Sequence, residues 1–193
     1  MVLKNNIQAG CIIFQSLDHN DQFNDAVSRS GKNNLTLAID NINHVGLYIG
    51  DDQVIEATQK YGVILRSLQT FLDAADSNLI ATINDPSLIK PAIMRAKACL
   101  GLPYNFSFHP TGNGLYCSQL ITHVFKTHQG QDYFQCYPMN FNDVDTQQIL
   151  PYWVDYYKAL QQAIPHGLVG SHPQQLLSQQ HLFSSIISYN SCK

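Results

Sequence analysis

Short apolar runs in the first third of the chain predict β-strands. The run "CIIFQ" (residues 11–15) is β-branched and bounded by Gly10 and a polar stretch, which predicts a buried strand. "HVGLYIG" and "QVIEAT" follow, separated by residues 50–52, a three-residue loop typical of a hairpin. "GVILRSL" (residues 62–68) predicts a third strand of the same meander. Residues 16–43 are rich in Asn, Asp and Ser, and we expect a long excursion with one short helix there.

Helical periodicity replaces this pattern in the rest of the chain. A stripe of apolar residues at 88, 89, 92, 93, 96 and 100 predicts a helix that Gly101 and Pro103 end. After the turn-rich loop "NFSFHPTGNG", a second stripe at 117, 120, 121, 124 and 125 predicts a buried helix face that starts at Cys117. The last third predicts a helix with Pro151 near its start, a Pro/Gly loop and a final short helix.

Composition sets limits on this picture. The 193 residues are 45% hydrophobic, enough for one sizeable core, so we expect a single domain over residues 1–193. Only 13% of residues are charged and the net charge is −3, which gives no broad basic field and argues against nucleic acid as a partner. No apolar stretch is long enough for a signal-peptide core or a membrane span, so the cytoplasm is the default compartment unless a leader has been removed. Oligomeric state does not follow from these features.

The cysteines argue against a metal-based or disulfide-based design. They are odd in number, widely spaced and without a CxxC pair, and they lie at positions 11, 99, 117, 136 and 192. We therefore expect no metal, no cofactor and at least one free thiol.

Cys117 is the strongest candidate for a nucleophilic cysteine. It falls in the first turn of its predicted helix, where unpaired backbone N–H groups and the helix dipole stabilise a thiolate. The same N–H groups can hold the oxyanion that forms when a thiolate attacks an acyl carbonyl. The competing interpretation is an inert buried cysteine, since free cysteine is among the most buried residue types. Catalysis also requires a base.

His44 and Glu56 supply a candidate base and its orienting group. His44 opens an apolar strand, and strand side chains alternate between the two sheet faces. With a loop over residues 50–52, Ile49 pairs with Gln53 and Gly46 with Glu56, so Glu56 shares the His44 face as a diagonal neighbour. A carboxylate that accepts the imidazole N–H would leave the other ring nitrogen for a thiol. Gly46, opposite Glu56, would leave room for this contact.

The arrangement depends on the register of the hairpin. A loop shorter by one residue would turn Glu56 to the Val45 face and separate it from His44. The alternative for Glu56 is a solvated carboxylate on an exposed face, although its apolar neighbours in "VIEAT" favour burial with a partner.

The order of these motifs resembles that of a known enzyme family. "CIIFQ", "NHVGLYIGDDQVIEA", "GVILRSL", "GLPYNFSF" and "LYCSQL" follow one another as in the circularly permuted NlpC/P60 cysteine hydrolases of the YiiX/YebB type. The resemblance runs from about Gly10 to Leu182. It implies a papain-like α+β fold, an antiparallel, barrel-like sheet with the nucleophile helix packed against it. It also implies Cys117 as nucleophile, His44 as base and Glu56 as the third polar group.

The chain departs from the family pattern at three positions. Cys11 replaces an aspartate that often precedes the first strand, Asn105 stands in "PYN" for "PYD", and Gln119 stands in "YCSQL" for "YCSEL". Each change removes a carboxylate near the expected cleft, so the charge of the substrate is in doubt. Tyr104, Tyr116 and Ser118 keep the pattern and are candidates for substrate binding, although tyrosines beside a helix start often serve packing.

The sequence therefore predicts a thiol hydrolase that cleaves a peptide, cell-wall peptide or other amide bond, or an ester, through a thioacyl-enzyme. A lipid or thioester acyltransferase or phospholipase would use the same three residues with a different substrate or acceptor. A non-catalytic peptide-binding module is the alternative outside the enzymes.

Overall fold

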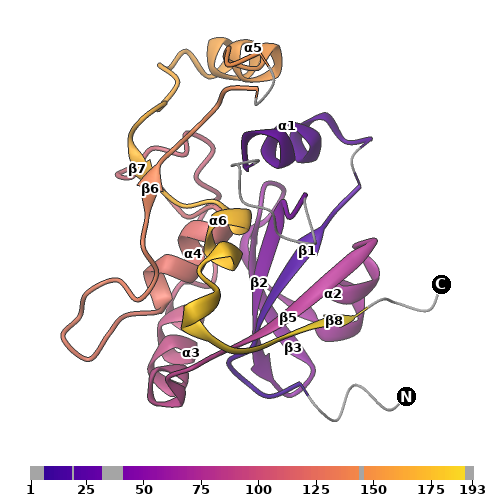
Figure 1. Ribbon diagram of the computed structural model, residues 1–193, viewed down its shortest axis with the longest axis vertical. Helices are drawn as coiled ribbons and strands as arrows, with labels where there is room; N and C mark the ends of the chain where they lie inside the picture. The colour runs from indigo at the N-terminus through magenta and orange to yellow at the C-terminus, as the bar shows by residue number, and fades with distance from the viewer. Residues whose placement is uncertain (1–6, 19, 32–40, 144–145, 190–193) are drawn as a thin grey trace.

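The computed structural model describes residues 7–18, 20–31, 41–143 and 146–189, and an antiparallel sheet forms its centre. The sheet has six strands in the order β4-β3-β2-β1-β5-β8, and a two-stranded ribbon of β6 and β7 stands apart from it (Figure 1). The strands are β1 (Ile12–Ser16), β2 (His44–Gly50), β3 (Gln53–Thr58), β4 (Gly62–Ser67), β5 (Ser77–Ile83), β6 (Tyr137–Pro138), β7 (Val169–Gly170) and β8 (Phe183–Tyr189).

Helices cover both faces of the sheet and one end of it. Figure 1 shows α3, α4 and α6 on one side of the sheet, and α1 and α5 beyond the end where β2 begins. The helices are α1 (Gln22–Gly31), α2 (Leu68–Asp73), α3 (Ile89–Ala98), α4 (Cys117–Val124), α5 (Pro151–Leu160) and α6 (Pro173–Ser178), with short 3-10 turns at Pro86–Leu88 and Gln180–Leu182.

The strand residues alternate between two hydrophobic cores. Val45, Leu47 and Ile55 belong to the core that contains α4, whereas Tyr48 and Val54 pack with α2 on the opposite face. This alternation is the period-2 pattern of strands buried on both sides. A third cluster, rich in aromatic side chains, joins α1 to α5.

Most of the predicted elements are confirmed. The meander of β1 to β4, the helix within the excursion, the helices at Ile89, Cys117 and Pro151 and the final short helix are all present. The sequence patterns did not predict α2, β5, β8, the short ribbon of β6 and β7, or the two 3-10 turns. β5 pairs with β1 and β8 pairs with β5, so the sheet extends two strands beyond the predicted meander.

The prediction of a three-residue hairpin loop at residues 50–52 is wrong. Gly50 pairs with Gln53, and the turn consists of Asp51 and Asp52, both with positive φ (51° and 58°). Asp tolerates this left-handed conformation better than most residues. The predicted pair of Ile49 with Gln53 is therefore absent, and the register shifts at Ile49, between Tyr48 and Gly50. This bulge offsets the shorter turn, so Gly46 still lies opposite Glu56 as predicted.

Candidate active site

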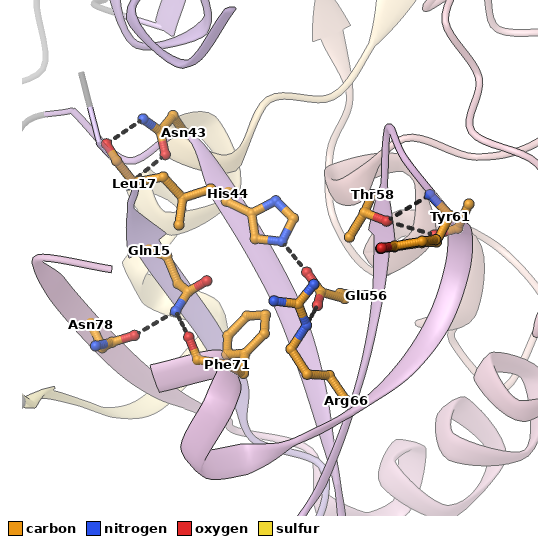
Figure 2. A network of polar contacts seen from close by, with 11 residues as sticks. Gln15, Leu17, Asn43, His44, Glu56, Thr58, Tyr61, Arg66, Phe71 and Asn78 are labelled. Atoms are coloured by element: carbon orange, nitrogen blue, oxygen red, sulfur yellow. Dashed lines mark hydrogen bonds and ion pairs between the residues drawn. The ribbon is translucent and has the colours of Figure 1, made fainter. Parts of the chain in front are cut away.

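His44 and Glu56 meet on the sheet face that α2 covers. His44 is the first residue of β2, and its Nε2 lies 2.7 Å from Glu56 Oε2 on β3 (Figure 2). Glu56 is only 3% exposed, so this hydrogen bond is shielded from water. Because Nε2 is taken by the carboxylate, Nδ1 is the ring nitrogen left for a second partner.

The second partner of His44 is Cys117. Cys117 is the first residue of α4 and is 7% exposed, and it lies close enough to His44 to raise the pKa of the imidazole. Burial by itself lowers the pKa of His44, but the hydrogen bonds and charges of Cys117 and Glu56 outweigh it and raise the pKa to about 10. A histidine that is readily protonated beside a cysteine and a carboxylate is the arrangement that nucleophilic thiol chemistry uses.

Arg66 holds the far side of Glu56, a contact that the sequence prediction missed. Arg66 Nε lies 2.5 Å from Glu56 Oε1 (Figure 2), and its side chain is 27% exposed. The guanidinium offsets the cost of burying an ionised carboxylate. The predicted strand over residues 62–68 already contained this residue. Arg66 on β4 pairs with Val54, so its side chain lies on the same sheet face as Glu56.

Gly46 makes room for a phenyl ring and not for the ion pair. A Cβ at Gly46 would lie 2.8 Å from Phe71 Cζ and 2.8 Å from Val54 Cγ1. The Phe71 ring centroid is 5.8 Å from that of His44. The missed helix α2 thus brings a side chain that packs against the catalytic candidate.

Cys117, His44 and Glu56 share one cleft of about 210 Å³. We call its two sides the sheet wall and the aromatic wall. The sheet wall consists of the lining residues from β1 to β4 and α2: Gln15, His44, Glu56, Ala57, Thr58, Arg66 and Phe71. The aromatic wall consists of residues from α1, the loop before α4, the loop after β6, and α5: Phe23, Phe108, Phe141 and Trp153.

The three candidate substrate-binding residues also line the cleft. Tyr116 and Ser118 are tied to Ser171, whose N–H donates to the Tyr116 hydroxyl at 3.1 Å and whose Oγ lies 3.1 Å from Ser118 Oγ. Burial, together with nearby Cys117 and tyrosines, raises the pKa of Tyr104 well above its ordinary value and keeps its phenol neutral. Substrate contact by these three residues stays a prediction.

Asn105 and Gln119, two of the departures from the family pattern, bind each other. Asn105 Nδ2 donates to Gln119 Oε1 at 3.1 Å and to the carbonyl of His109 at 2.9 Å. Neither residue is among those that line the cleft. The amide pair fixes the loop before α4, so these two replacements change a loop anchor and carry no information about the charge of the substrate.

His172 is a second cleft histidine with a different environment. Its Nε2 lies 2.9 Å from the carbonyl of Val27, and its Nδ1 accepts from the N–H of Gln174 at 3.1 Å. Burial lowers the pKa of His172 to about 4. Both ring nitrogens are occupied, so His172 caps α6 as a neutral imidazole.

Comparison with known proteins decides the family. The family model described as "Permuted papain-like amidase enzyme, YaeF/YiiX, C92 family" matches residues 6–184, most of the chain. The chain belongs to this family. It is accordingly a thiol-dependent hydrolase of the permuted papain-like type, which confirms the family resemblance and the α+β fold expected from the sequence.

A solved structure supports the same architecture. The crystal structure of the metalloprotein yiiX from Escherichia coli superposes with a TM-score of 0.70 over 96% of this chain and 97% of that one, at 17% identity. In the described part of our chain, no group of three or more His, Cys, Asp or Glu side chains is placed to hold a metal ion. None of the described helices is long and apolar enough to cross a membrane.

Two curated relatives match a smaller part of the chain. Gamma-DL-glutamyl hydrolase of Bacillus subtilis is 30% identical over 86 residues, which are 43% of this chain and 21% of that protein. Protein OPG091 of Variola virus is 29% identical over 87 residues, 43% of this chain and 50% of that protein. The chain thus spans between about a fifth and half of the length of these relatives.

Proposed function

We propose that this protein hydrolyses an amide bond by attack of Cys117, with His44 as proton carrier and Glu56 as its orienting group. The observation that carries the proposal is the His44 ring held between Cys117 and Glu56 Oε2 inside a cleft. The pKa of about 10 for His44 favours the imidazolium at neutral pH, so the proton for the leaving amine is already in place.

The reaction has two halves. The Cys117 thiolate attacks the carbonyl carbon, and the oxyanion lies against the first backbone N–H groups of α4, those of Cys117 and Ser118. The C–N bond then breaks, and the leaving nitrogen takes a proton from His44. In the second half, water gives a proton to His44 and attacks the thioester, the C–S bond breaks, and the carboxylic acid leaves with the Cys117 thiolate and the His44 imidazolium restored.

The substrate class is a peptide-type amide. The relative from Bacillus subtilis is named for hydrolysis of γ-glutamyl bonds, so γ-glutamyl amides are the first substrates to test, followed by cell-wall peptides and esters. The sheet wall favours a polar substrate, because Gln15, Glu56 and Arg66 present polar and charged groups to the cleft.

Selective alkylation of Cys117 tests the mechanism. Iodoacetamide at neutral pH should modify Cys117 at least tenfold faster than Cys11, Cys99 and Cys136, because the last three lack a histidine partner in the structure. Peptide mapping by mass spectrometry gives the rate at each thiol. The selectivity should vanish in His44→Ala. A Cys117 that reacts as slowly as the other cysteines would contradict the proposal and favour a peptide-binding module.

The aromatic wall favours a second candidate, transfer or hydrolysis of an apolar acyl group. Phe23, Phe108 and Trp153 contact one another, with ring centroids 5.8 to 6.1 Å apart, and present apolar surface to the cleft. Turnover of phospholipids or acyl thioesters at rates above those of peptide amides, with an alcohol or amine as acceptor, would identify this activity. Loss of both activities in Cys117→Ala would assign them to one site.

A further inference from the structure

We propose that Arg66 and Gln15 form a substrate subsite beside His44, in which Arg66 binds a free carboxylate of the substrate and Gln15 accepts one of its N–H groups. This inference rests on the proposed amide hydrolysis and specifies its substrate: an amide with a carboxylate close to the bond that is cleaved.

The guanidinium of Arg66 has N–H donors that its ion pair with Glu56 does not use. Among the described residues, its only ion-pair partner is Glu56, which uses Nε and leaves the two terminal nitrogens of the guanidinium. Arg66 lines the cleft and is the one lining residue of the described chain that carries a permanent positive charge. Two parallel N–H groups of a guanidinium match the two oxygens of a carboxylate.

The carbonyl oxygen of the Gln15 side chain is forced to face the cleft. Gln15 Nε2 donates to the backbone carbonyl of Phe71 at 2.7 Å and to Asn78 Oδ1 at 2.7 Å. Asn78 is itself fixed, because its Nδ2 donates to the backbone carbonyl of Leu72 at 3.1 Å. Backbone carbonyls only accept, so both amide orientations are determined, and both hydrogens of Gln15 Nε2 are used.

Gln15 Oε1 therefore remains as an acceptor. No described residue donates to it, although Gln15 is only 1% exposed and lines the cleft. Figure 2 shows this oxygen turned away from Asn78, towards the side of His44. Gln15 pairs with His44 across β1 and β2, so the acceptor lies next to the reacting group. Gln15 Oε1 is not among the described side-chain atoms that are fully buried without a partner, so it is open to the cleft, where a ligand or water can donate to it.

The two groups together select a carboxylate over a phosphate. A phosphate would bring a second negative charge next to Glu56, which is 2.5 Å from Arg66 Nε, and it has no N–H for Gln15. An amino-acid residue with a free carboxylate provides one charge and one N–H. The subsite thus fits an acyl-amino acid or a peptide end.

Paired alkylating probes test the subsite. N-iodoacetylglycine and N-iodoacetylglycinamide differ only in the carboxylate. We expect the carboxylate probe to modify Cys117 about 10- to 100-fold faster than the carboxamide probe, the range of one charge-assisted hydrogen-bonded contact. In Arg66→Gln the ratio of the two rates should fall close to one, and Arg66→Lys should retain part of it. N-iodoacetylsarcosine, which lacks the N–H, should react about 2- to 10-fold slower than the glycine probe.

The ratio of the two alkylation rates distinguishes direct binding of the carboxylate by Arg66 from an indirect role of Arg66 through Glu56. If Arg66 acts only through Glu56, Arg66→Gln slows both probes equally and the unchanged ratio overturns the proposal. Lys126→Gln, which removes a surface cation that pairs with Asp132, is the matched control and should leave the ratio unchanged.

If Cys117 reacts with neither probe, that result counts against the proposed function and leaves the subsite to be tested separately. A binding measurement then tests whether the subsite prefers a carboxylate. Trp153, the single tryptophan of the chain, lines the cleft and reports on occupancy by its fluorescence. In Cys117→Ala, N-acetylglycine should bind about tenfold more tightly than N-acetylglycinamide, and Arg66→Gln should remove the difference. Equal affinities in Cys117→Ala would overturn the subsite.

Discussion

The cleft contains two histidines in opposite electrostatic states, His44 on the sheet wall and His172 at the start of α6. His44 on the sheet wall has a pKa raised to about 10, whereas burial lowers the pKa of His172, on the opposite side, to about 4. Glu56 and Cys117 make the difference at His44, because the hydrogen bonds of the His172 ring within the described residues go to a backbone carbonyl and a backbone N–H. Burial alone thus lowers the pKa of a histidine, whereas a buried carboxylate and a cysteine beside it raise the pKa.

The two walls also differ in the sequence separation of the residues that contact each other in them. His44 and Glu56 are 12 residues apart on adjacent strands, so the register of one hairpin fixes their contact. On the other side, the Trp153 indole N–H donates to Ser30 Oγ at 2.8 Å across 123 residues. The sheet wall is thus set by local pairing and the aromatic wall by packing between distant segments, so substitutions in the two walls should affect different quantities.

The largest effect should come from the orienting carboxylate. Glu56→Gln keeps the shape of the side chain but removes the charge that stabilises the imidazolium, so the pKa of His44 should fall. We expect turnover to drop about 100-fold or more, the lower range for loss of acid–base support. Stopped-flow alkylation and steady-state turnover measure it. Asp51→Asn, the same change in the exposed hairpin turn, is the control, and an equal loss there would contradict the assignment.

The two histidines should affect stability at opposite ends of the pH range. We call the loss of stability at high pH the alkaline limb and the loss at low pH the acid limb. The pKa of His44 is raised above its ordinary value of 6.5, so its stabilisation is complete below about pH 6.5 and is lost as the pH rises towards 10. The pKa of His172 is lowered to about 4, so its stabilisation is present above about pH 6.5 and is lost as the pH falls towards 4. Urea unfolding from pH 4 to 10 should show His44→Gln without the alkaline limb and His172→Asn without the acid limb. Identical profiles in both variants would refute this assignment.

The sequence predicted the elements that carry the candidate triad but not those that pack around it. The alternation in "HVGLYIG" and "QVIEAT" was enough to place Glu56 with His44, since the bulge at Ile49 offset the error in the turn. That compensation was not predictable, because turn length and bulge position depend on twist and packing as well as on composition. Cys117 at a helix start followed from the spacing of apolar residues alone.

The residues around this centre required knowledge of distant pairings. Phe71 comes from α2, a helix of six residues with too little periodicity to be noticed. β5 has an apolar, β-branched run that was overlooked, and its Asn78 orients Gln15. Arg66 was visible as a residue of the third strand, but its role needed the register between β3 and β4.

A methyl group at Gly46 should disturb the sheet wall through packing. Its Cβ would lie 2.8 Å from Phe71 Cζ, so Phe71 must move, and the His44 ring beside it loses a neighbour. We expect Gly46→Ala to lower the free energy of unfolding by about 1 to 3 kcal/mol. Urea unfolding measures this, and the smaller side chain in Gly46→Ala/Phe71→Leu should recover part of the loss. Additive effects of the two substitutions would show that Phe71 is not the obstacle.

The smallest effect should be found in the aromatic wall. Ser30→Ala removes the acceptor of the Trp153 indole N–H at a position that is 6% exposed, and one neutral hydrogen bond contributes about 1 kcal/mol. We expect the urea midpoint to fall accordingly, while the acid and alkaline limbs of the stability profile stay at the same pH, because no titrating group is altered. Ser185→Ala, on the exposed edge strand β8, is the matched control and should leave the midpoint unchanged. A shift of the alkaline limb in Ser30→Ala would show that the two walls are coupled, since the aromatic wall would then contribute to the charge state of His44.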